Sequence, residues 1–102
     1  MKTYDVFISE DALIDLHNGK DFYNRQEQGV GDYFWDSLIS DLELLTLYAG
    51  VHKNISGFHH MYAKRFPYTI YYTIAERQAL VAAVLPMRRN PDWIGEQLKT
   101  RH

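Results

Sequence analysis

Four cations stand at the ends of two apolar stretches in the second half of the chain, as the pairs Lys64-Arg65 and Arg88-Arg89. A guanidinium fork binds phosphate or carboxylate through two parallel hydrogen bonds, so these pairs could hold an anion. Neighbouring side chains on a strand point to opposite faces, which prevents both members of a pair from lining one site. We therefore expect Arg65 and either Arg88 or Arg89 to meet near one end of a sheet. The alternative is that these arginines form ion pairs with acidic residues of the helices.

Histidines and tyrosines surround the first cation pair. His59 and His60 are adjacent and would face opposite ways on a strand, so they form a poor chelating pair, and we expect no metal site and no cofactor. His60 or His59 could act as a base, because histidine titrates near neutral pH. Tyr68, Tyr71 and Tyr72 could stack on nucleic-acid bases, although tyrosines in strands more often pack the sheet.

The composition restricts the class of protein. A chain of 102 residues predicts a single domain over 1–102, and the absence of cysteine excludes disulfides and thiolate chemistry. The first 51 residues carry three basic and ten acidic side chains, net −7, whereas the rest carry eight and three, net +5, which together give −2. A basic face could thus meet a partner despite the negative total. With no secretory leader and no apolar stretch of about 18 residues, we expect a cytoplasmic protein without a membrane partner.

Helical periodicity dominates the first half after a short strand over residues 3–8. Ser9 is a suitable N-cap for a helix in which Leu13, Leu16 and Tyr23 are spaced to lie on one side. Gly29 is expected to adopt a left-handed conformation in the break that follows. A second apolar stripe, Phe34, Leu38, Leu42 and Leu45, predicts a helix over 32–48, so the two should form an antiparallel helical hairpin.

Strand-like patterning fills most of the second half. Residues 50–57 should form a loop, followed by strands at 58–65, 68–75 and 79–87 that pair antiparallel through short turns. Asn90 followed by Pro91 predicts a last helix that runs to Lys99 and docks through Trp93, Ile94 and Leu98. The expected fold is therefore α+β, in the order strand-helix-helix-strand-strand-strand-helix, with an antiparallel sheet packed by the N-terminal helical hairpin.

Three segments together resemble the RelE/ParE superfamily of toxins from bacterial type II toxin–antitoxin (plasmid stabilisation) modules. They are Ser9-Glu10-Asp11-Ala12-Leu13-Ile14-Asp15-Leu16, Lys64-Arg65-Phe66-Pro67-Tyr68-Thr69-Ile70-Tyr71-Tyr72 and Arg88-Arg89-Asn90-Pro91-Asp92-Trp93-Ile94. The resemblance covers nearly the whole chain. It implies a growth-inhibiting toxin that forms a hetero-oligomer with a small cognate antitoxin, which wraps the sheet and helices.

The superfamily has two kinds of activity. RelE-like members cut messenger RNA on the ribosome, and by resemblance Lys64, Arg65 and Arg88 would be the catalytic cations. ParE-like members instead inhibit DNA gyrase and are not enzymes. In either case the resemblance places antitoxin or target binding at Arg65, Arg88, Arg89, His60 and Tyr68.

Two departures bear on the choice between these activities. No tyrosine follows Tyr72, the only later histidine is the terminal His102, and Pro86 stands where RelE/ParE-like proteins often have a histidine, so a general acid is missing. The net acidic chain also suits ribosomal RNA poorly. We therefore favour gyrase inhibition over RNA cleavage. The missing acid also motivates a further hypothesis, that the chain is an inactive toxin relative that serves as an interaction module.

Overall fold

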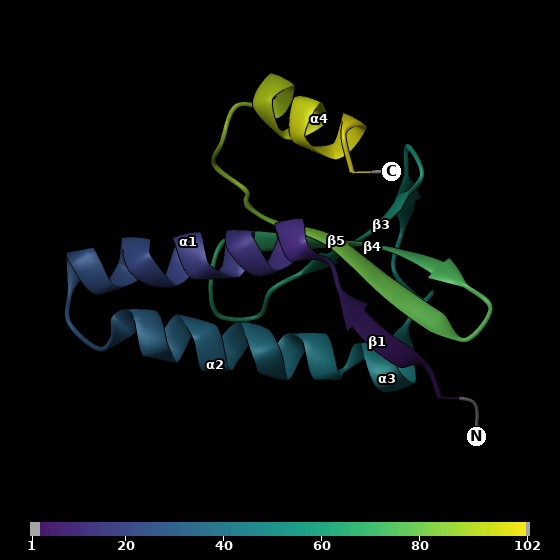
Figure 1. Cartoon of the computed structure of the whole chain (residues 1–102), viewed down its shortest axis with the longest axis horizontal. Helices are drawn as coiled ribbons and strands as arrows, with labels where there is room; N and C mark the ends of the chain where they lie inside the picture. Colours follow the sequence, from purple (N-terminus) through teal and green to yellow (C-terminus); the bar gives the residue numbers. More distant parts are fainter. Residues whose placement is uncertain (1–2, 102) are drawn as a thin grey trace.

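A helical hairpin and a short C-terminal helix enclose a five-stranded sheet in the computed structural model, which describes residues 3–101 (Figure 1). The elements follow in the order β1 (Asp5–Ile8), α1 (Glu10–Gln26), α2 (Val30–Glu43), α3 (Leu45–Tyr48), β2 (Asn54–Ile55), β3 (Phe58–Tyr62), β4 (Tyr68–Ala75), β5 (Gln78–Pro86) and α4 (Pro91–Lys99). The α+β class is as expected, but α3 and β2 are additional elements. The predicted helix over 32–48 is divided at Leu44, and the predicted loop over 50–57 contains β2.

The hairpin of α1 and α2 forms where the sequence predicts it. Ser9 caps α1 by accepting a hydrogen bond from the backbone N–H of Ala12 at 3.1 Å, and Gly29 adopts a left-handed φ of 93° before α2. Gly19 lies in the interior of α1, where a glycine weakens an isolated helix. Here it is buried, and a Cβ at this position would stand 2.5 Å from the Phe34 ring. The missing side chain is therefore what lets α2 pack closely on α1.

The sheet is mixed, so the prediction of a wholly antiparallel sheet is wrong. Its strand order is β1-β5-β4-β3-β2, and the run from β2 to β5 is an antiparallel meander, as expected from the short links. The first strand pairs parallel with the last, with Val6 opposite Ala79. This happens because the chain passes through the hairpin, enters the sheet at the far edge, and returns to β1 after four alternating strands.

Two apolar cores lie on opposite faces of the sheet. The larger one joins the hairpin to the sheet through residues such as Phe34, Leu38 and Tyr72, whereas the smaller one, Phe58, Tyr71, Ala83 and Leu85, is covered by α4. Strand β5 contributes buried residues to both cores and is therefore covered on both sides.

A β-bulge interrupts the pairing of β4 with β5. Tyr71 stands opposite Ala83, but the next residue, Tyr72, stands opposite Val81, so Ala82 is the extra residue of β5. A bulge leaves backbone groups without a ladder partner and increases the local twist. Near this bulge, Ala82 O accepts from Ser9 and Arg101, and Val84 N–H donates to Asp15.

Candidate functional site

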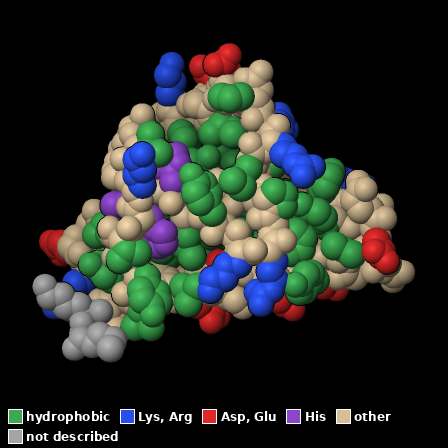
Figure 2. Space-filling model, turned by 180° about the vertical axis from the view of Figure 1, so that it is seen from behind, with side chains coloured by type: hydrophobic (Ala, Val, Ile, Leu, Met, Phe, Trp, Pro, Cys, Tyr) green, Lys and Arg blue, Asp and Glu red, His purple; other side chains and the backbone are tan. Residues whose placement is uncertain are grey.

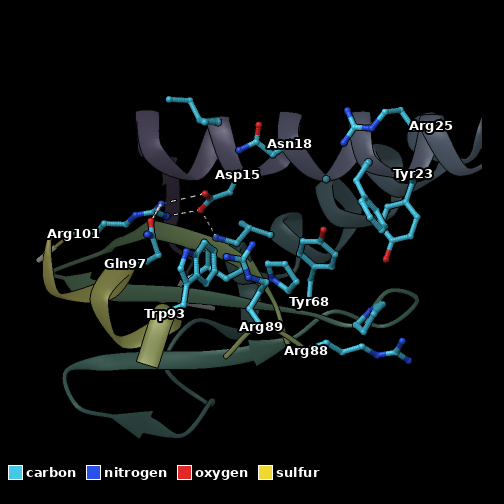
Figure 3. Close-up of a pocket in the computed structure, with 17 residues that line it drawn as sticks. Asp15, Asn18, Tyr23, Arg25, Tyr68, Arg88, Arg89, Trp93, Gln97 and Arg101 are labelled. Carbon is cyan, nitrogen blue, oxygen red and sulfur yellow. Dashed lines mark hydrogen bonds and ion pairs between the residues drawn. The ribbon is translucent and has the colours of Figure 1, made fainter. Parts of the chain in front are cut away.

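A groove of about 630 Å³ lies between α1, α4 and the sheet end where β5 finishes and β4 begins (Figure 3). We call it the α1–α4 groove. Its lining combines apolar and aromatic side chains with four arginines and few other charges. The lining residues are Ile14, Asp15, Asn18, Gly19, Phe22, Tyr23, Arg25, Pro67, Tyr68, Val84, Leu85, Pro86, Arg88, Arg89, Trp93, Gln97 and Arg101.

Three of the four arginines have no carboxylate partner among the described residues. Among residues 3–101, the ion pairs are Lys20–Asp32, Lys99–Glu96 and Arg101–Asp15. None of them includes Arg25, Arg88 or Arg89, which are all exposed. Arg65 likewise forms no ion pair with an acidic residue of the described helices. Three unpaired guanidinium groups make the groove electropositive in an acidic protein.

Arg88 and Arg89 differ in how they are held. The guanidinium carbon of Arg89 lies 3.8 Å from the centroid of the Trp93 ring, a cation–π contact at the start of α4. Arg88 extends away from this stack (Figure 3). The two side chains thus diverge, as expected for neighbours at a strand end, and Arg89 is the one placed by a neighbouring ring.

Two tyrosines stand at the inner wall of the groove, with ring centroids 6.3 Å apart. Burial raises the pKa of Tyr68 to about 12, and it also raises the pKa of Tyr23, which the nearby charge of Arg88 partly opposes. Both hydroxyls are therefore protonated at neutral pH and can donate hydrogen bonds to an anion. The described lining residues include no histidine.

A buried ion pair closes the α4 end of the groove. Arg101 donates from Nη1 to Oδ2 of Asp15 at 2.5 Å and from Nη2 to Oδ1 at 3.2 Å, and both side chains are about nine-tenths buried. The backbone N–H of Val84 also donates to Asp15 Oδ2, at 3.0 Å. Burial raises the pKa of Asp15, while the hydrogen bonds from Arg101 and Val84 act in the opposite direction. This carboxylate is fully engaged, so it does not neutralise the free arginines.

The structure brings together only half of the residues predicted for the site. Tyr68, Arg88 and Arg89 line the groove, whereas Lys64 and Arg65 do not. Because β3 ends at Tyr62, both cations lie in the exposed turn before β4. This turn is at the same end of the sheet, since Met87 N–H donates to Pro67 O at 2.8 Å, but Arg65 does not join Arg88 or Arg89 in one concavity.

His60 lies elsewhere, on the face covered by α4. It borders a cavity of about 260 Å³ together with Ile94 and Leu98. Its Nε2 atom is buried without a hydrogen-bond partner, and burial lowers the pKa of the imidazole. A neutral, enclosed imidazole of this kind does not contribute to the α1–α4 groove.

The other strand histidine takes part in a separate polar cluster on the hairpin side. His59 stacks on the fully buried Tyr72 with ring centroids 4.9 Å apart, and the Tyr72 hydroxyl lies 2.5 Å from Nδ1 of His52. Histidine side chains also gather among hydrophobic ones on the face seen in Figure 2. Within residues 3–101, no three His, Cys, Asp or Glu side chains are arranged to hold a metal ion. The described helices are too short or too polar to cross a membrane.

Sequence reasoning missed Arg25, Asp15 and Arg101 as parts of the groove. One signal was present, because Asp15 falls between Ala12 and Leu16 on the apolar side of α1. A carboxylate at such a position needs a cation or several donors to be buried. Arg101 carried no comparable signal, since it is separated from Asp15 by 86 residues.

Comparison with solved structures defines the class of fold. The chain superposes with a TM-score of 0.76 on a chain of a structure described as "Chromosomal ParDE TA system from P. aeruginosa", at 11% identity and over 84% of this chain and 98% of that one. No protein-family model and no curated protein sequence matches. At 11% identity this likeness is one of fold, and the fold that the resemblance implied is found.

Proposed function

We propose that this chain is the toxin of a bacterial type II toxin–antitoxin system that acts in the cytoplasm and is neutralised by a small cognate antitoxin in a hetero-oligomer. The observation that carries the proposal is the fold shared with a chain of a ParDE system over most of both chains. The motifs of the α1 start and of the Arg88–Ile94 segment point the same way.

Within this class we favour ParE-like inhibition of DNA gyrase over RelE-like RNA cleavage. The groove supplies cations and an aromatic wall, which suit binding, but its tyrosine hydroxyls have raised pKa values and none of its described lining residues is a histidine. RNA cleavage by 2′-hydroxyl attack needs a proton acceptor and a donor for the leaving oxygen. The cations that the resemblance assigns to catalysis are also dispersed, because Lys64 and Arg65 stand outside the groove.

RNA cleavage is the alternative, and one observation favours it. Arg25, Arg88 and Arg89 surround the groove without carboxylate partners, so they could stabilise the charge of a phosphate in its transition state. A third hypothesis is that the chain is an inactive relative that acts as an interaction module. It is compatible with the same fold and predicts no toxicity.

Controlled expression in a bacterium tests the proposal. Induction of the chain alone should arrest growth, and co-expression of the adjacent small antitoxin gene should restore it. Arrest with an SOS response and accumulated cleaved DNA supports gyrase inhibition, whereas cuts at codon positions in translated messages support RNA cleavage. Normal growth at a high level of folded protein would overturn the proposal and leave the interaction module.

Variants of the groove locate the functional surface. Arg88→Ala and Arg89→Ala should reduce toxicity, because both remove a free cation of the groove. Lys99→Ala is the matched control, since Lys99 is exposed on α4 and pairs with Glu96 outside the groove. Full toxicity of both arginine variants would show that the groove is not the surface that meets the target.

A further inference from the structure

Helix α4 is attached to the sheet by few apolar contacts. Of its nine residues none is buried, and only Trp93, Ile94 and Leu98 pack on the smaller core. Burial of half-exposed side chains contributes less than burial of complete ones, because the hydrophobic gain follows the area removed from water. By itself this interface should hold α4 loosely.

The residue that closes the C-terminal end of α4 is held much more firmly. Arg101 makes two hydrogen bonds to Asp15 of α1, a third from Nη2 to Gln97 Oε1 at 3.1 Å and a longer one from Nη1 to Ala82 O at 3.4 Å. A bidentate guanidinium–carboxylate pair fixes orientation as well as distance. Arg101 therefore joins α4 to both α1 and β5.

The open edge of β5 makes this junction possible, because β1 pairs with β5 only as far as Val81. Ala82 is the extra residue of the bulge, and its carbonyl accepts from Arg101 and, at 3.4 Å, from the Ser9 hydroxyl. The N–H of Val84, just after the bulge, donates to Asp15. Backbone groups at the edge of β5 beyond its pairing with β1 thus bond to the ion pair, and they satisfy the charges that burial would otherwise penalise.

We infer that Arg101 is a positioning residue of the α1–α4 groove: its pair with Asp15 holds α4 in place and so fixes the wall formed by Trp93 and Arg89. The inference does not depend on the proposed function. Trp93 belongs to α4, and the guanidinium of Arg89 rests on its ring. Figure 3 shows the pair and the stack along one side of the groove, with Gln97 between them. When the pair is broken, α4 retains only its half-buried apolar contacts, and the wall should open on a faster time scale than the hairpin.

Quenching of Trp93 fluorescence by acrylamide tests this inference. In a Trp35→Phe background Trp93 is the sole tryptophan, and Arg101→Gln should raise its quenching constant at least about twofold through local opening of α4. The quenching constant of Arg101→Lys should fall between those of the Trp35→Phe background and of Arg101→Gln, because an ammonium keeps the charge but cannot form the bidentate pair. Lys99→Gln removes the same charge from the exposed Lys99–Glu96 pair of the same helix, and it should leave quenching unchanged.

Amide hydrogen exchange separates positioning from general stabilisation. In the Arg101→Gln variant, amide exchange should accelerate in α4 while the amides of α2 and β4 keep their protection. Equal acceleration in all three elements, or quenching no greater than in Lys99→Gln, would overturn the inference. If Arg101→Gln does not fold, Asp15→Asn is measured in the same way, because its amide oxygen can still accept from Val84. Unchanged protection of Trp93 in that variant would overturn the inference as well.

Discussion

The helical hairpin and α4 cover opposite faces of one sheet, and different interactions attach them to it. The hairpin shares with the sheet a core of fourteen buried residues among those described, including fully enclosed Phe34 and Leu38. The α4 side has four buried residues, all contributed by the sheet, and a polar junction at Arg101. Apolar burial tolerates small shifts, whereas a bidentate ion pair has one geometry. The hairpin side thus supplies most of the apolar burial, and on the α4 side the ion pair fixes one wall of the groove.

The largest expected effect is on the hairpin side. Leu38→Ala should lower the free energy of unfolding by about 2–5 kcal/mol, because Leu38 is fully buried and its truncation leaves a cavity. Leu47→Ala is the matched control, since 48% of that leucine is exposed, and it should change stability by less than about 0.5 kcal/mol. Urea denaturation measures both. Similar losses in the two variants would contradict the placement of the core.

Alanine substitutions at one glycine of α1 and one of α4 test how closely each helix is packed. Gly19→Ala should destabilise the protein by about 1–3 kcal/mol, because the new methyl group would overlap the Phe34 ring. Gly95→Ala should instead stabilise it by up to about 1 kcal/mol, since a Cβ there meets no atom within 4 Å and alanine favours the helix. Thermal and urea unfolding of the two variants give the sign. A stabilising Gly19→Ala would show that the hairpin is less closely packed than described.

One histidine on each side of the sheet should make stability depend on pH. Burial lowers the pKa of His52, near Tyr72, and of His60, beneath α4. As the pH falls, these histidines therefore take up protons in the unfolded chain before they do so in the folded one. Their contribution to stability is complete above the ordinary pKa of 6.5 and is lost as the pH falls below it. Urea unfolding at about pH 7.5 and about pH 5.5 measures the loss. His52→Asn and His60→Asn should each flatten this dependence, and a profile unchanged in both would refute the assignment.

The smallest effect belongs to the surface of α4. Lys99→Gln removes the pair with Glu96, in which both side chains are more than 70% exposed, and should change the free energy of unfolding by less than about 0.5 kcal/mol. Added salt should reduce even this difference. Urea unfolding at low and high ionic strength provides the measurement. Breaking a buried ion pair costs several times more, so a loss of unfolding free energy above about 1 kcal/mol would contradict this prediction. It would show that α4 depends on this contact as well as on Arg101.

Local signals in the chain predicted most of the elements. The Asn90-Pro91 start of α4 is confirmed, with Asn90 accepting from Asp92 N–H at 2.7 Å, and β4 spans Tyr68–Ala75 as expected from its patterning. The break at Leu44 was missed because the apolar stripe continues through Leu45 without a proline or glycine to mark it. The short β2 was missed because two residues carry no measurable alternation.

Half of the residues predicted for the site lie in the groove. Tyr68, Arg88 and Arg89 were predicted from residue type and position at the strand ends, and they do line the groove. Arg65 was expected beside them, but the early end of β3 leaves it in the turn. The alternation rule applies only while the chain remains a strand.

The sequence by itself determined the class of fold, the hairpin, the meander and the last helix, because caps, turns and periodicity act between residues close in the chain. Only the tertiary structure decided that β1 pairs parallel with β5, that a bulge lies at Ala82, and that Arg101 meets Asp15. The parallel pairing and the ion pair join segments roughly 70 or more residues apart, and the bulge interrupts the pairing of two neighbouring strands. Such contacts depend on how the hairpin folds across the sheet, which no local pattern encodes.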